Sequence, residues 1–149
     1  MNKNLREVEA LVELVNEYVQ IEKTIAVLPC GYISVKHISG HTYNYRQWRE
    51  GNKIISSYVP EALLNGVKRK ISVRKENEAL LKVVKKDLKK ASAKLVKVGV
   101  LGEDDVKVLL ECARNGGDVT EKAKELVKYF IRFKKCAKRC NLNSCIFLL

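Results

Sequence analysis

The sequence lacks the long apolar run that marks a membrane protein. No stretch among its 149 residues approaches the roughly 18 consecutive apolar residues that a membrane-spanning helix needs. The N-terminal residues lead into a helical pattern punctuated by glutamates and not into an apolar segment, so we expect no signal peptide. These absences predict a cytoplasmic protein with no membrane partner.

Motifs of the large enzyme families are also missing. The chain contains no phosphate loop, no dinucleotide fingerprint and no zinc-protease motif. Cys30 with His37 or His41 could form a nucleophile pair, but a histidine on a strand usually packs or faces solvent. The acidic residues 103–105 could suggest a metal site, yet their place at the start of a helix explains them better. We expect a non-catalytic protein without a cofactor.

Cysteines are few and odd in number. Five cysteines without an export signal argue against a disulfide framework. Cys136, Cys140 and Cys145 could bind zinc only if Cys30, Cys112 or a histidine supplied a fourth ligand. The spacing of the first two is equally typical of packed residues one helical turn apart. We therefore expect no metal.

The remaining composition indicates a folded, strongly basic protein. Apolar residues make up 46% of the chain, and the formal net charge is +12. The length suits one domain with a real core, which we expect to span residues 1–149. A charge of this size favours an anionic partner, such as nucleic acid or an acidic protein surface.

Periodicity along the chain predicts an α+β fold. Residues 4–26 form an amphipathic helix pattern, and residues 32–38, 42–49 and 53–59 are strand-like runs separated by glycine-containing turns. This layout predicts a three-stranded antiparallel meander with one face packed on helices. A short helical turn over residues 61–65 should end at Gly66, and a long basic helix should follow over residues 67–98. Two further helices, from about residue 103 to 115 and from Asp118 or Thr120 to about Arg139, with Phe130 and Phe133 inward, would make residues 100–149 a helical subdomain beside residues 1–99.

The long helix carries most of the charge. Residues 61–99 hold twelve lysines and arginines against four acidic residues, which is +8 of the total +12. The cations recur at helical spacing and interleave with apolar residues such as Leu88 and Leu95, which predicts a cationic stripe beside an apolar stripe. The acidic first helix could cover the apolar seam, but its five glutamates cannot neutralise twelve cations. Exposed lysines can also simply solvate a helix.

The meander adds aromatic residues to this charge. Aromatic rings can stack on bases while arginine and lysine hold phosphates, although the aromatics could equally pack on the helices. Alternation places Tyr43, Tyr45, Gln47 and Arg49 on one face, and Asn44, Arg46 and Trp48 on the other. The residues that we expect to contact nucleic acid are Tyr43, Tyr45, Arg46, Trp48, Arg49, Lys53, Lys68, Arg69, Lys70, Arg74, Lys75, Lys82, Lys85, Lys86, Lys89 and Lys90.

A resemblance appears at the meander. Its pattern is Gly31-x-Ile33-x-x-Lys36-x-Ile38-x-Gly40-x-x-Tyr43-x-Tyr45, followed by Arg49-x-Gly51-x-Lys53-Ile54-x-Ser56-x-Tyr58-Val59. It resembles a pattern in small uncharacterised prokaryotic and mobile-element proteins, in which a basic helix follows the meander. The layout is also similar to the arm-binding sheet of phage-type integrases, which enters a DNA groove. Recombinase activity is not implied, because the chain has no room for the integrase catalytic domain.

We therefore expect nucleic-acid binding, in which stripe and meander could share one face. A different class of function also fits. The protein could be a small phage- or mobile-element-encoded inhibitor or adaptor that places its cations on an acidic surface of a host nucleic-acid-handling complex, such as a CRISPR effector. Self-association of the long helix into a homodimer is a third possibility.

Overall fold

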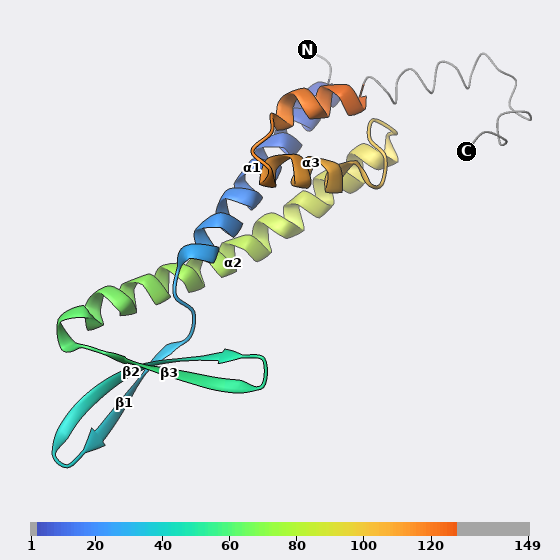
Figure 1. Ribbon diagram of the computed structural model, residues 1–149. Helices are drawn as coiled ribbons and strands as arrows, with labels where there is room; N and C mark the ends of the chain where they lie inside the picture. The colour runs from blue at the N-terminus through green and yellow to red at the C-terminus, as the bar shows by residue number, and fades with distance from the viewer. Residues whose placement is uncertain (1–2, 128–149) are drawn as a thin grey trace, which may run out of the picture. The chain divides into compact units, whose positions relative to one another are not determined.

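The first helix forms because its apolar residues recur at helical spacing. The computed structural model describes residues 3–127, and in it α1 spans Lys3–Val27 (Figure 1). Val8, Leu11, Val15 and Val19 on one face of α1 are almost completely buried. The helix expected over residues 4–26 is confirmed.

Three strands follow in a simple meander. Strands β1 (Tyr32–Ile38), β2 (His41–Glu50) and β3 (Lys53–Val59) pair antiparallel in the order β1-β2-β3. The loop between β1 and β2 has only two residues, Ser39 and Gly40, and both have positive φ, as a tight hairpin turn requires. The expected strands are confirmed, and β2 is one residue longer at each end than expected.

Helix α2 corrects the sequence prediction. It runs as one helix over Glu61–Lys97 and passes through Gly66, where we expected a helix to end. A glycine inside a helix costs only about 1 kcal/mol relative to alanine. Burial of Leu64 and Ile71 on either side of Gly66 outweighs that cost. The helix is continuous, and its 37 residues correspond to a length of about 55 Å.

The C-terminal helices begin where the sequence predicts. Helix α3 spans Asp105–Arg114, and a further helix begins at residue 119 and continues to residue 127, the last described residue. The Asp118 carboxylate accepts hydrogen bonds from the backbone N–H groups of Thr120 (2.8 Å) and Glu121 (3.1 Å), so it caps this helix. Its expected course to Arg139, with Phe130 and Phe133, lies outside the described residues.

The described chain divides into two compact units. One unit contains residues 3–20 and 83–127, and the other contains Ile21–Lys82 with the whole sheet. In the first unit a single core joins α1 to the second half of α2 and to α3, through residues such as Leu11, Leu95 and Leu109. Residues 83–97 of α2 share that core with the C-terminal helices, and the subdomain expected over residues 100–149 stays a prediction.

Candidate nucleic-acid interface

The meander has two chemically different faces. Neighbouring residues of a strand point to opposite sides of the sheet. The strand register places residues of the same face side by side in rows across the sheet, so that Tyr45 lies opposite Ser34 on β1 and Tyr58 on β3. One face gathers all the tyrosines of the sheet, and we call it the tyrosine face. It consists of Tyr32, Ser34, Lys36, Ile38, His41, Tyr43, Tyr45, Gln47, Arg49, Ile54, Ser56 and Tyr58.

The tyrosine rings of this face contact one another edge to face. The Tyr58 ring centroid lies 5.8 Å from that of Tyr45 and 6.3 Å from that of Tyr43, with interplanar angles of 68° and 61°. The Tyr43 ring also meets His41 at 6.4 Å. Tyr58 and Tyr32 are 55% and 53% exposed, whereas Tyr43 and Tyr45 are half-buried. The rings therefore form an ordered group that still presents aromatic surface to solvent.

The electrostatics of the tyrosine face are purely cationic. The Lys36 ammonium lies 4.9 Å from the centroid of the Tyr45 ring, in cation–π contact, and Arg49 is exposed at the far end of β2. The Tyr32 hydroxyl donates a hydrogen bond to Gln47 Oε1 at 2.8 Å, which orients that ring. None of the twelve residues of the face is acidic.

The opposite face of the sheet lies toward the start of α2. There Asn44 is buried, and its Nδ2 donates to the Glu61 carboxylate at 2.9 Å. The Arg46 guanidinium lies 4.0 Å from the centroid of the Trp48 ring, and the Trp48 indole N–H donates to Glu50 at 2.8 Å. Trp48 is thus engaged on its face and at its nitrogen, which leaves it poorly placed to stack on a base.

A cleft opens beside this second face. It has a volume of about 700 Å³ and is lined mainly by apolar residues of β3, of α2 and of the end of α1, together with Arg46 and Lys70. Tyr58 of the tyrosine face also contributes to this lining, at the edge of the sheet. The sheet residues named from the sequence are therefore split between two sides. Tyr43, Tyr45 and Arg49 belong to the tyrosine face, whereas Arg46, Trp48 and Lys53 belong to the other, as alternation predicts.

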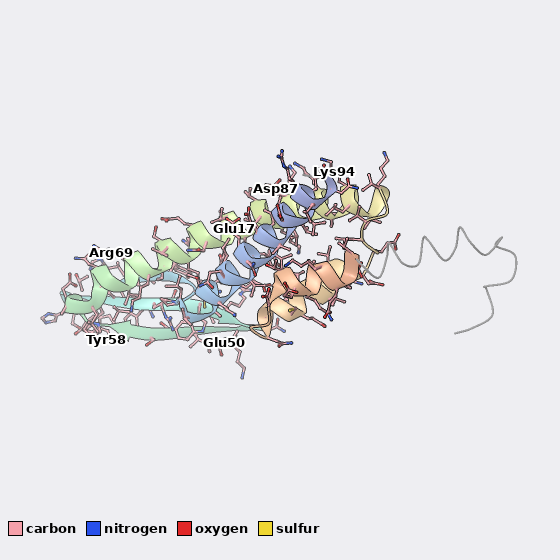
Figure 2. All side chains as sticks on the ribbon, turned by 90° about the horizontal axis from the view of Figure 1, so that it is seen from above. Glu17, Glu50, Tyr58, Arg69, Asp87 and Lys94 are labelled. Atoms are coloured by element: carbon pink, nitrogen blue, oxygen red, sulfur yellow. The ribbon has the colours of Figure 1, made fainter. Side chains whose placement is uncertain are left out.

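Most cations of α2 in the sheet-containing unit are exposed. Lys68, Lys75 and Lys82 recur every seven residues, so they follow one side of the helix. Arg69 and Lys70 are also exposed, and within the described residues none of these five cations has an ion-pair partner. Figure 2 labels Arg69 on α2 and Tyr58 on the sheet of the same unit.

Arg74 has a structural role that its sequence position does not reveal. Its Nη1 donates to the carbonyl oxygens of Ile25 (2.6 Å) and Leu28 (2.7 Å), and its Nε pairs with Glu78 at 2.8 Å. Ile25 lies in the last turn of α1, and its carbonyl also accepts from the Leu28 N–H at 3.2 Å, while Leu28 follows the helix end, where carbonyls have no partner within the helix. The expectation that Arg74 contacts nucleic acid is not supported by this geometry, because its guanidinium is already engaged.

The other unit contains the second half of the cationic stripe. Lys85, Lys86 and Lys89 are exposed, while Lys90 lies 3.6 Å from Asp87 and Lys94 pairs with Glu7 of α1 at 2.9 Å. The expected apolar seam between α1 and α2 is confirmed in this unit by the buried residues Val8, Leu11, Val15, Leu88 and Leu95.

Three lysines that follow α2 are, by contrast, matched to carboxylates. Lys107 pairs with Asp104 at 2.7 Å, Lys122 with Glu125 at 3.0 Å and Lys124 with Glu121 at 2.6 Å. The hydrogen bond and charge of Asp104 raise the pKa of Lys107, and the same contact lowers the pKa of Asp104. The Glu121 carboxylate raises the pKa of Lys124 in the same way. Within the described residues these three lysines therefore differ from Lys68, Arg69, Lys70, Lys75 and Lys82 of α2, which have no ion-pair partner.

The structure adds no ligand to the metal site that the cysteines suggested, within the residues that it describes. Cys30 and Cys112 are free and half-buried, and Cys136, Cys140 and Cys145 lie outside the described residues. In the part of the chain that the structure describes, no group of three or more histidine, cysteine or acidic side chains could hold a metal ion.

The histidine and acidic groups have local partners. The His37 ring nitrogen Nδ1 lies 3.2 Å from Thr42 Oγ1 across the hairpin. Asp105 accepts a hydrogen bond from the Gly102 N–H, and Asp104 pairs with Lys107, so these acidic residues serve the start of α3.

Three residues of the tyrosine face were missed from the sequence. Tyr32, Lys36 and Tyr58 stand on strands whose faces could be assigned only once their register with β2 was known. The signal was present in the two-residue alternation of each strand, because a two-residue hairpin loop fixes the register of β1 against β2.

Comparisons place the chain in a family of unknown function. Among residues 3–127, no helix has both the length and the apolar character needed to cross a membrane. No curated protein and no solved structure matches the chain, so the expected likeness to the integrase arm-binding sheet is not confirmed. Residues 5–82, just over half of the chain, match the family described as Domain of unknown function (DUF6788). The chain therefore belongs to the DUF6788 family, and the matched region includes the entire tyrosine face.

Proposed function

We propose that this protein binds nucleic acid, with the tyrosine face contacting bases and the free cations of the sheet and α2 contacting phosphates. The observation that carries the proposal is the composition of the tyrosine face: four tyrosines, two permanent cations and no carboxylate on one exposed surface. Aromatic platforms flanked by basic residues are how sheet-based proteins bind nucleic acid.

The distribution of charge supports the same function. Five cations of α2 in the sheet-containing unit, Lys68, Arg69, Lys70, Lys75 and Lys82, are exposed, and within the described residues none of them has a carboxylate partner. A surface of this kind attracts phosphates and releases their counterions when it binds. Six to eight phosphate contacts would weaken binding about 10³-fold or more between about 50 and 200 mM salt.

A salt series tests this proposal. We expect the logarithm of the association constant for a labelled oligonucleotide to fall linearly with the logarithm of salt concentration. Replacing Lys68, Lys75 and Lys82 by glutamine should reduce the magnitude of the slope by about 2 to 3, at about 0.7 to 0.9 per phosphate contact. Glutamine is used because it keeps helix propensity while it removes the charge.

A matched variant separates local contacts from net charge. Replacing Lys107, Lys122 and Lys124 by glutamine removes the same formal charge, but each of these lysines already has a carboxylate partner. This variant should bind with nearly the wild-type slope. A flat salt response, or no binding to plain nucleic acid, would contradict the proposal and favour the inhibitor or adaptor that binds an acidic protein surface.

A further inference from the structure

We infer that the tyrosine face takes single-stranded nucleic acid, with unpaired bases stacked on its rings. This inference rests on the proposed function and specifies its ligand. In a duplex each base face is covered by the next base pair, and proteins read the base edges from the grooves. A tyrosine ring offers an aromatic face, which is complementary to the face of an unpaired base.

The tyrosines occupy successive rows of the sheet. Tyr43 stands opposite Lys36, Tyr45 stands in the next row beside Tyr58, and Tyr32 stands in the row after that, opposite Gln47. Successive rows on one face are two residues apart, which corresponds to about 6.6–6.8 Å along a strand. This spacing is about twice the 3.4 Å advance per nucleotide of a duplex strand. An extended strand with separated bases can match it, and a stacked duplex cannot.

The exposed fractions identify the central ring. Tyr58 is 55% exposed and makes edge contacts with Tyr43 and Tyr45, which hold its ring in place without covering it. The Tyr45 ring is occupied by the Lys36 ammonium 4.9 Å away, so this cation lies close to where the phosphate beside a stacked base would pass. Three rows of rings correspond to about three nucleotides, and Arg49 lies one row beyond Tyr32.

The charge of the face favours nucleic acid over a protein partner. Tyrosine-rich surfaces also serve protein interfaces, where arginine is common and charges of both signs form the rim. Here the twelve residues include Lys36 and Arg49 and no acidic residue, in a chain of net charge +12. A polyanion can bind this face because none of its residues carries a carboxylate that would repel a phosphate.

Binding of matched oligonucleotides tests the inference. Fluorescence anisotropy would compare a labelled 12-nucleotide oligothymidine with a 12-base-pair blunt duplex at one salt concentration. We expect the single strand to bind more tightly. Tyr58→Leu should weaken single-strand binding about 5- to 150-fold, because one stacked base is lost, while Tyr58→Phe, which keeps the ring, should bind like the wild type.

Controls keep the outcomes distinct. Trp48→Phe alters an aromatic residue on the opposite face, so it should leave single-strand affinity unchanged. Because Tyr58 is more than half exposed, Tyr58→Leu should keep the far-ultraviolet circular dichroism of the wild type. Duplex preference, or a Tyr58→Leu variant with wild-type affinity, overturns the single-strand inference and leaves nucleic-acid binding intact. Failure to bind either oligonucleotide overturns both, and a protein partner whose capture requires Tyr58 would then explain the face.

Discussion

Arg74 provides a sharp test of how the sheet-containing unit is held together. Replacing it by methionine keeps an unbranched apolar side chain of similar length and removes the guanidinium. The change leaves the carbonyl oxygens of Ile25 and Leu28 without the donor that now lies 2.6 and 2.7 Å away. The end of α1 would also lose a positive charge that complements its helix dipole.

The expected loss can be worked out from these contacts. Both carbonyl bonds come from one nitrogen, so we count them as a single charge-assisted interaction worth about 1.5–3 kcal/mol. The pair with Glu78 adds about 0.3–0.5 kcal/mol, and the half-buried position lets water replace part of the loss. We expect Arg74→Met to lower the free energy of unfolding by about 2–3 kcal/mol, or the melting temperature by about 4–12 °C.

Urea denaturation followed by circular dichroism would measure this loss as a lower midpoint with an unchanged slope. Lys75→Met is the matched control, because Lys75 is an exposed neighbour on α2 without an ion-pair partner in the described residues. Arg74→Lys should fall between the two, since an ammonium lacks the planar fork of the guanidinium. If Arg74→Met and Lys75→Met differ by less than about 0.5 kcal/mol, the two carbonyl bonds do not stabilise the fold and our reasoning is wrong.

Three further predictions follow from single positions. Gly66→Ala should raise the free energy of unfolding by up to about 1 kcal/mol, because a Cβ there meets no atom within 4 Å; an unchanged or lower midpoint in urea would contradict a continuous α2. Gly31→Ala should be far more harmful than Gly40→Ala, although φ is positive at both, because only at Gly31 would a Cβ lie 2.0 Å from a backbone oxygen of β2; equal melting temperatures would contradict this. The Asp104 carboxyl should titrate below its ordinary pKa of 3.8 in an NMR experiment, because Lys107 stabilises its charged form, and Lys107→Met should return it to that value. The lowered pKa of Asp104 belongs to the folded state. Any stabilisation of the fold by this ion pair is therefore present above the unfolded-state pKa and is lost as the pH falls through the folded-state pKa. A rise in stability as the pH falls over that range would contradict the pairing of Asp104 with Lys107.

Local pattern determined the elements of this protein. The 3.6-residue period of apolar residues predicted α1, and the two-residue period with glycine-containing turns predicted the meander, because both depend on the geometry of neighbouring residues. The cationic stripe could likewise be read from spacing, and so could the division of Tyr43 and Tyr45 from Arg46 and Trp48.

Tertiary structure decided which of these residues are available. Alternation defines two faces of a sheet but not which face is covered. The start of α2 lies against the face opposite the tyrosines, because Glu61, 17 residues beyond Asn44, accepts a hydrogen bond from the buried Asn44 amide. Arg74 looked like any other cation of the stripe until the fold brought it to carbonyls 46 and 49 residues earlier in the chain. Sequence spacing determines which face of a helix or strand each side chain occupies. Only the packing of distant segments determines which charged groups and rings on those faces remain free to bind.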